Sequence, residues 1–498
     1  NELSQIKKVD IRTKIYPLYA SALFCNMTEL TNFVNIQNLK TDYTTDMCAM
    51  FMLCKNLQSI DLSYLNTKRV TNMRSMFDSC GYNSMTSLVL PENFDTSNVT
   101  SMAYMFFYCG YNSLSELKLL SNFNTSKVTN MQSMFGLCGN SGLTEFNFPE
   151  NFITSNVETM GWMFEGFGRK KIKKLELPNT FDTSKVTNMA GMFFDCGSEN
   201  MTKLVLPECF DTVNVTNMQY MFFNCGGKNI TELTLPSKFV TSKVTNMGYM
   251  FQNLSKITSI DISNFDTSKV TDMKYMFANC KEITQINVSK FNTSKVTTME
   301  GMFIHCYKLK GANLKNFNTE NVTNISAMFS GCFELENLDV SCFDTSKVID
   351  RSYFCNDCYK ITSLDLRNWD TRNVTNMTGM FSGCGYMKMT SLTLPEAFCT
   401  SNVTDMSQMF YQCGYTAMTS LILSEKFDTS NVTDMSQMFY LCGYSAMTNL
   451  TLPQNFNTTN VTKMSYMFSY CGYTAMTSLT LPEAFCTSNV TDMSNMFY

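Results

Sequence analysis

The sequence contains little charge, little proline or glycine, and almost no histidine. Its 498 residues include 38 Lys and Arg, 42 Asp and Glu and one His, which gives a formal net charge of −4. Charged residues make up 16%, below the roughly 25% that is usual in soluble domains, so the composition offers no broad positive surface for nucleic acid or anionic lipid. With only 22 Gly and 9 Pro against 44% hydrophobic residues, the composition also excludes a disordered chain. We expect a chain that is folded throughout.

Long apolar runs and catalytic groupings are missing as well. No apolar run reaches about 18 residues, so we expect no membrane span within this segment. His305 precedes Cys306, but adjacent residues of a regular element point in different directions and make a poor nucleophile and base pair. Cys355 and Cys358 form a lone Cys-x-x-Cys without a second pair of metal ligands. The sequence therefore predicts a protein that is not an enzyme, with no cofactor, no metal and no nucleic acid partner.

One pattern recurs along almost the whole chain. A Met-Phe pair occurs at 50–51, at 496–497 and at fourteen places between, and Phe354-Cys355 fills the one missing place, which makes seventeen units. Six of the sixteen intervals are 26 residues long and ten are 29, so no linker fits between units. Tandem units of this length indicate a solenoid. We expect residues 1–22 to be an N-terminal cap or the end of a preceding region. Residues 23–498 would then form a single repeat solenoid, with a degenerate first unit and a last unit cut short at 498.

The apolar spacing changes within each unit, which indicates two kinds of element. Met389, Leu392 and Leu394 alternate before Pro395, as in a short strand of about five residues. The following apolar residues have helical spacing: Val403, Met406, Met409, Phe410 and Cys413. Gly414 stands where a helix C-cap belongs. We expect an α/β repeat solenoid with one short parallel strand and one short helix per unit, forming a curved, elongated arc.

Most cysteines share one position of the repeat. Fourteen of the 21 lie there, from Cys54 to Cys471, and Phe167 and Leu254 replace Cys in two other units. A position that accepts Cys, Leu or Phe favours a buried apolar side chain, so we expect a buried stack of free thiols.

The recurring phrases Phe265–Met273 and Val432–Phe439 resemble a known repeat family. They are similar to the 26-residue repeat of bacterial surface proteins and mycoplasma surface lipoproteins, which is grouped with the BspA-like leucine-rich repeats. The resemblance implies a leucine-rich-repeat-like fold and an extracellular or cell-surface adhesion protein. The chain departs from ordinary leucine-rich repeats because Phe265 and Phe291 stand where their consensus places Asn or Cys. We therefore expect Asp-Thr-Ser side chains to hold this turn.

Two sets of exposed side chains are candidate binding surfaces. The first, the ligand ribbon, comprises the outward strand positions of the last units: Thr390, Ser391, Thr393, Thr419, Ser420, Thr448, Asn449, Thr451, Thr477, Ser478 and Thr480. The second, the aromatic ridge, comprises Tyr82, Tyr111, Tyr386, Tyr415, Tyr444 and Tyr473. Exposed tyrosines suit protein or glycan contacts, although packing between neighbouring corners explains them equally well.

Three functions fit these features. The first is adhesion, in which the ribbon binds a protein or glycan ligand on a host, a matrix or a neighbouring cell. Residues 389–407 and 476–494 are identical, and a protein that tolerates such duplication is more readily a multivalent binder than a catalyst. The alternative is a structural stalk or fibre subunit that associates end to end. A minor alternative is an ice-binding array of Thr and Ser.

Overall fold

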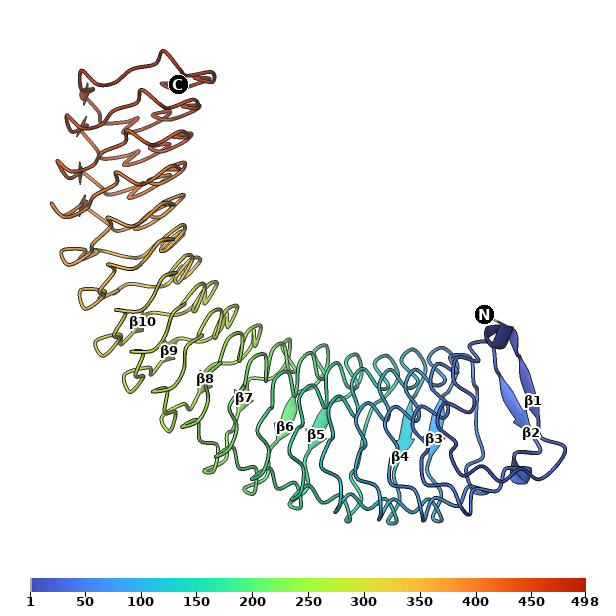
Figure 1. Ribbon diagram of the computed structural model, residues 1–498. Helices are drawn as coiled ribbons and strands as arrows, with labels where there is room; N and C mark the ends of the chain where they lie inside the picture. The colour runs from blue at the N-terminus through green and yellow to red at the C-terminus, as the bar shows by residue number, and fades with distance from the viewer. Residues whose placement is uncertain (1) are drawn as a thin grey trace. The chain divides into compact units, whose positions relative to one another are not determined.

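The protein is a β-solenoid, in which successive coils of the chain stack with their strands parallel. The computed structural model describes residues 2–498 and is drawn in Figure 1. The chain divides into two compact units. Unit 1 comprises Asn1–Val244 and Met250–Ile260, and unit 2 comprises Thr245–Tyr249 and Asp261–Tyr498.

Each strand is two or three residues long and contributes one step of a parallel ladder. The strands of unit 1 are β1 (Lys8–Asp10), β2 (Asn32–Val34), β3 (Ser87–Val89), β4 (Glu116–Lys118), β5 (Lys174–Glu176), β6 (Lys203–Val205), β7 (Glu232–Leu233) and β8 (Ser259–Ile260). Unit 1 also contains two 3₁₀ helices, η1 (Glu2–Gln5) and η2 (Ile36–Asn38). The strands of unit 2 are β9 (Gln285–Ile286), β10 (Gly311–Ala312), β11 (Ser391–Thr393), β12 (Ser420–Ile422), β13 (Asn449–Thr451) and β14 (Ser478–Thr480).

The strands pair in register, one repeat apart. Leu392 of β11 lies opposite Leu421 of β12, and Leu450 of β13 lies opposite Leu479 of β14. The central leucines of β11, β12 and β13 are buried while most of their neighbours are exposed, as the alternating pattern predicts. The strands are shorter than the five residues expected, although Met389 and Leu394, which flank β11, are buried as well.

The core consists of identical side chains stacked from coil to coil. In unit 2, the rings of Phe410 and Phe439 stack with centroids 5.4 Å apart, and Phe439 stacks on Phe468 at the same distance. The fourteen cysteines of the shared position are all buried, and none of the 21 cysteines forms a disulfide within residues 2–498. The predicted buried stack of thiols is therefore confirmed.

The predicted helix is wrong. No α-helix occurs in residues 2–498, and the segment from Val403 to Cys413 consists of a parallel bridge at Asp405 followed by a run of tight turns. Gln408 has a φ of 60° and Gln412 a φ of 53°, both in the left-handed region. The amide of Met409 donates to the carbonyl of Met406 (3.2 Å), whereas the amide of Phe410 donates to Met438 of the next coil (2.9 Å). Local turns and bonds between coils thus alternate along the segment.

The spacing between coils explains why turns replace the helix. An α-helix with its side chains is about 10–12 Å wide, whereas hydrogen-bonded strands lie about 4.8 Å apart. Backbone bonds between neighbouring coils on this wall leave no room for a helix. The helical spacing correctly identified Val403, Met406, Met409, Phe410 and Cys413 as buried residues. Gly414, with a φ of 55°, lies within the run of turns, and its carbonyl accepts the amide of Met418 (3.1 Å), so it does not end a helix.

The predicted Asp-Thr-Ser turn is confirmed for its Asp and Thr side chains, whereas the hydroxyl of Ser430 forms no hydrogen bond within residues 2–498 and the following Asn431 takes part instead. The Asp428 carboxylate accepts the amide of Ser430 (2.9 Å), which closes the turn locally. The Thr429 hydroxyl donates to the carbonyl of Asn457 in the next coil (2.8 Å). The side-chain amide of Asn431 donates to the carbonyl of Ser401 in the preceding coil (2.6 Å). One turn therefore bonds to the coils on both sides of it.

The first residues already take part in the ladder. Ile15 pairs in parallel with Leu39, and the amide of Ala20 donates to the carbonyl of Asp46 (2.9 Å). The assignment of residues 1–22 as a cap stays a prediction. Within residues 2–498, no helix is long and apolar enough to cross a membrane.

Candidate binding surfaces

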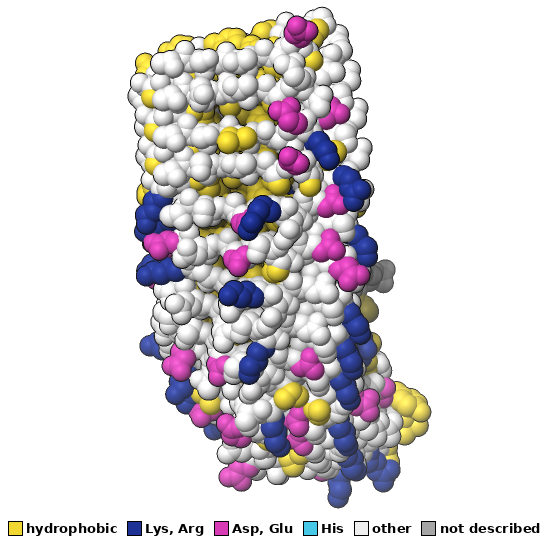
Figure 2. Space-filling model, turned by 90° about the vertical axis from the view of Figure 1, so that its left-hand side faces the viewer, with side chains coloured by type: hydrophobic (Ala, Val, Ile, Leu, Met, Phe, Trp, Pro, Cys, Tyr) yellow, Lys and Arg dark blue, Asp and Glu magenta, His cyan; other side chains and the backbone are white. Residues whose placement is uncertain are grey.

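The ligand ribbon lies on the outer side of β11 to β14. Ser391 pairs with Ser420 and Thr393 with Ile422, while Asn449 pairs with Ser478 and Thr451 with Thr480. Ser420 is half-buried, and the other ten residues of the ribbon are exposed. Ile422, 53% exposed, interrupts the row of polar side chains. In Figure 2, the face of these coils carries few charged side chains, and most of those lie toward its margin.

The hydroxyl groups of the ribbon fall into two sets. The hydroxyls of Thr419 and Thr477 donate to the carbonyls of Thr390 and Thr448 in the preceding coils (both 3.3 Å), so they help to hold the coils together. The other nine side chains form no hydrogen bond with any residue from 2 to 498, and seven of these nine lie on β11 to β14: Ser391, Thr393, Ser420, Asn449, Thr451, Ser478 and Thr480. These seven side chains are available to a ligand.

The aromatic ridge is packed against itself. In unit 2, the ring of Tyr415 stacks on Tyr386 with centroids 4.6 Å apart and on Tyr444 at 4.7 Å, and Tyr444 stacks on Tyr473 at 5.4 Å. Tyr82 and Tyr111 stack in the same way in unit 1 (4.9 Å). Burial raises the pKa of Tyr82 and of Tyr415. Because neighbouring rings cover one another, the ridge presents mainly ring edges and hydroxyls.

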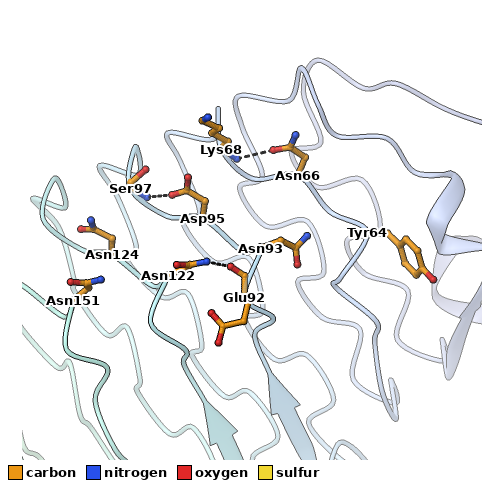
Figure 3. Close-up of a pocket in the computed structure, with 10 residues that line it drawn as sticks. All are labelled: Tyr64, Asn66, Lys68, Glu92, Asn93, Asp95, Ser97, Asn122, Asn124 and Asn151. Carbon is orange, nitrogen blue, oxygen red and sulfur yellow. Dashed lines mark hydrogen bonds between the residues drawn. The ribbon is translucent and has the colours of Figure 1, made fainter.

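A polar hollow in unit 1 is a third surface, which the sequence did not indicate. Its volume is about 570 Å³. It lies at the turns that follow the strand wall of four successive coils (Figure 3). The residues lining it are Tyr64, Asn66, Lys68, Glu92, Asn93, Asp95, Ser97, Asn122, Asn124 and Asn151.

Backbone carbonyls fix three asparagines of this hollow in a row. The side-chain amide of Asn93 donates to the carbonyl of Ser63 (2.7 Å), that of Asn151 donates to Ser121 (2.8 Å), and that of Asn122 donates to Glu92. Figure 3 shows the three side chains on successive coils, with Tyr64 at the end of the row. The row results from asparagine at one position of three successive repeats, a signal that only an alignment of the repeats contains.

A short basic segment also lies in unit 1. Five of the six residues from 169 to 174 are Arg or Lys, and the side chain of Ile172 between them is buried. Two of the five basic side chains are paired, Arg169 with Asp195 (3.7 Å between charged atoms) and Lys174 with Glu176. The segment is therefore partly neutralised by its own neighbours.

The residues considered for catalysis do not meet. The thiol of Cys306 donates to the carbonyl of Phe277 (3.2 Å), and burial raises its pKa well above the usual value. His305 lies 3.2 Å from the side-chain oxygen of Asn279, and burial lowers its pKa. No group of three or more His, Cys, Asp or Glu within residues 2–498 is arranged to hold a metal ion.

The fold and these surfaces define a tandem-repeat β-solenoid with polar outer faces. Its sequence matches the family described as "Mycoplasma protein of unknown function, DUF285" at residues 19–106, 81–169, 139–234, 228–332, 305–416 and 387–498. These matches together span most of the chain, so the protein belongs to this family. No curated protein matches the chain.

Several solved structures are similar to this chain. A leucine-rich repeat protein from Bacteroides ovatus is 13% identical, covers 79% of this chain and 80% of its own, and has a TM-score of 0.35. A leucine-rich cell surface protein from Faecalibacterium prausnitzii is 17% identical, with coverages of 72% and 82% and a TM-score of 0.30. The functional domain of InlJ from Listeria monocytogenes, which includes a cysteine ladder, is 14% identical, with coverages of 83% and 71% and a TM-score of 0.25.

Proposed function

We propose that this protein is a BspA-like adhesion protein of the cell surface or extracellular space. It binds a protein or glycan ligand on another surface through the ligand ribbon. One observation carries the proposal: seven polar side chains on β11 to β14 are free of internal hydrogen bonds. The fold has no need of them, because other Thr and Asn side chains already bond neighbouring coils.

The chemistry of the ribbon favours a neutral, extended partner. Earlier strands carry charges on the same face, such as Glu116 and Lys118 on β4 and Lys174 and Glu176 on β5, whereas β11 to β14 carry none. Hydroxyl and amide side chains both donate and accept hydrogen bonds, and they repeat along consecutive coils. Such a surface makes many equivalent weak contacts that add up over its length.

The test places charge on the ribbon and leaves the rest of the solenoid intact. The ribbon variant carries Thr393→Lys, Thr451→Lys and Thr480→Lys. The control carries Ala397→Lys, Ser445→Lys and Gln454→Lys, which are exposed residues outside the ribbon whose side chains form no hydrogen bond with residues 2–498. Binding of the whole chain to a panel of immobilised matrix proteins and neutral glycans is measured for both variants. We expect the ribbon variant to bind at least about tenfold more weakly than the control. Equal binding by the two variants would contradict the proposal.

The same samples distinguish the two alternatives. A fibre subunit would grow in light scattering as its concentration rises, and the ribbon variant would grow equally. An ice-binding array would lower the freezing point, and the ribbon variant would lose this effect. Ile422 and Asn449 break the regularity that an array of threonines would need.

A further inference from the structure

The polar hollow of unit 1 has the composition of a sugar-binding site. Ten side chains line it. Eight of them carry an amide, a carboxylate or a hydroxyl group, Lys68 carries an ammonium group, and Tyr64 adds an aromatic ring beside its hydroxyl. The full set is Tyr64, Asn66, Lys68, Glu92, Asn93, Asp95, Ser97, Asn122, Asn124 and Asn151. Its volume of about 570 Å³ falls within the roughly 300–1,000 Å³ of small-molecule sites. An apolar ligand has nothing to pack against here except the ring of Tyr64.

We infer that this hollow binds a neutral, linear oligosaccharide. Tyr64, Asn93, Asn122 and Asn151 occupy one position of the repeat on four successive coils, so they form a single column. Neighbouring coils lie about 4.8 Å apart, a spacing comparable to the length of one sugar ring in an extended chain. A linear sugar laid along the column would meet one side chain per ring.

The column is held ready to accept hydrogen bonds. The side-chain nitrogens of Asn93, Asn122 and Asn151 are used by backbone carbonyls, which fixes the orientation of each amide group. Their side-chain oxygens accept no hydrogen bond from residues 2–498, so they are open to the hydroxyls of a sugar. Fixed side chains lose little conformational entropy when a ligand binds.

A second column supplies further polar groups. The carboxylate of Asp95 uses one oxygen for the amide of Ser97 (2.8 Å) and leaves the other open. Asn124 in the next coil uses its side-chain oxygen for Ser126 (2.8 Å), which leaves its amide nitrogen free to donate. The ammonium of Lys68 has no ion-pair partner within residues 2–498. Acceptors and donors therefore face the same space, as a ligand with many hydroxyls requires.

The charges and the aromatic ring select this ligand class over others. Glu92 and Asp95 would repel a polyanion, since Lys68 is the one basic side chain that lines the hollow. Tyr64 is 48% exposed and stacks on no other ring within the described residues. The faces of an aromatic ring carry partial negative charge and attract the polarised C–H groups of a sugar ring. Tyr64 thus offers the open ring face that the self-stacked aromatic ridge lacks.

The test uses the whole chain with tetrasaccharides of glucose, N-acetylglucosamine and mannose as probes, titrated by calorimetry. We expect at least one probe to bind. Its affinity should be the same in 0.5 M salt, which is about three times the physiological concentration. Tyr64→Ala is expected to weaken this binding about tenfold or more, and Glu92→Gln to weaken it less. Tyr16→Ala is the matched control, because Tyr16 is 56% exposed and lies outside the hollow.

Three results would overturn the inference: no binding of any neutral probe, equal binding by the Tyr64→Ala variant, or binding only to sulfated polysaccharides. The inference is independent of the proposed function, because the hollow lies in unit 1 and the ribbon in unit 2. The triple ribbon variant is therefore expected to keep the sugar binding of the native chain. Loss of that binding in the ribbon variant would also count against a separate site.

Discussion

Arg351 stands where the preceding coil places Ile325 and the following coils place Met377 and Met406, and its side chain is fully buried. One of its terminal nitrogens donates to the carbonyls of Thr345 (2.9 Å) and Asp370, while its other two side-chain nitrogens have no partner. The guanidinium lies 5.0 Å from the ring of Trp369, and burial lowers its pKa to about 9. A buried cation with two unpaired nitrogens weakens the fold at this coil.

Replacing this cation is expected to stabilise the protein. Arg351→Met introduces methionine, which the following coils have at the same position as Met377 and Met406, and both of these side chains are buried. We expect the free energy of unfolding to rise by about 1–4 kcal/mol, measured as an increase in the midpoint of thermal unfolding. Met377→Arg is the reverse control and should lower the midpoint. A lower midpoint for Arg351→Met would show that the contact with Trp369 outweighs the cost of burial.

Gly414 is expected to tolerate no side chain. Its φ is 55°, and a Cβ atom added to it would lie 2.3 Å from the Cβ of Met418. We expect Gly414→Ala to lower the free energy of unfolding by about 1–3 kcal/mol or more, as read from denaturant midpoints. Gly311→Ala is the matched control, because Gly311 also lies in unit 2. A Cβ atom added to Gly311 would be 3.7 Å from its nearest neighbour, the carbonyl oxygen of Asn337, and the φ of Gly311 is not in the left-handed region. Equal losses for the two variants would contradict this explanation.

At the scale of the element, threonine serves two separate purposes. Thr429 is buried in a turn and donates to the next coil, whereas Thr393 on β11 is exposed and forms no internal hydrogen bond. Thr429→Val should lower the free energy of unfolding by about 1–3 kcal/mol, because the carbonyl of Asn457 loses its donor. Thr393→Val should leave stability unchanged and weaken ligand binding. Chemical denaturation of both variants distinguishes scaffold hydroxyls from ribbon hydroxyls, and the assignment fails if Thr393→Val is the more destabilising change.

The sequence predicted the repeat, the strands and the buried residues, but not the conformation of the second wall. Burial of Val403, Met406 and Met409 follows from their spacing whether the segment is a helix or a run of turns, since both advance three to four residues per turn. The deciding feature is a left-handed conformation at Gln408 and Gln412, which no glycine or asparagine marks in this coil, although Gly379 and Gly383 hold the same positions with positive φ in the preceding coil. Only the bonds between coils favour that conformation there.

The binding surfaces could be predicted only in part, again because contacts between coils decide features that the sequence of one coil does not show. Alternation along a strand shows which side chains point outward, so the exposure of Thr393 and Thr451 could be foreseen. Which hydroxyls remain free depends on contacts between coils. The polar hollow depends on Asn93, Asn122 and Asn151 recurring at one position of a turn. Reading each unit alone does not show that recurrence, whereas aligning the units does.

At the scale of the whole molecule, carboxylates close turns throughout the solenoid. Asp261, Asp344 and Asp492 each accept the backbone amide two residues further along the chain, at 2.9–3.0 Å. These hydrogen bonds hold the pKa of all three carboxyls below the usual 3.8. Burial has the opposite effect elsewhere and raises the pKa of Asp78 and of Glu165. Turn carboxylates recur along the chain, because many repeats place Asp at the same turn.

Acid is therefore expected to destabilise the protein. A carboxyl whose pKa is lower in the folded state than in the unfolded chain stabilises the fold fully above the unfolded value, and this contribution is lost as the pH falls through the folded value. Stability, measured as the urea midpoint, should be constant at neutral pH and fall once the pH drops below about 4. Asp344→Asn keeps an oxygen that accepts the amide of Ser346 but removes the titrating group, so this variant should lose less stability in acid than the native chain. A midpoint that rises as the pH falls toward about 4 would show instead that the buried carboxyls, such as Glu165, dominate, because a carboxyl with a raised pKa binds its proton in the folded state at a higher pH than in the unfolded chain.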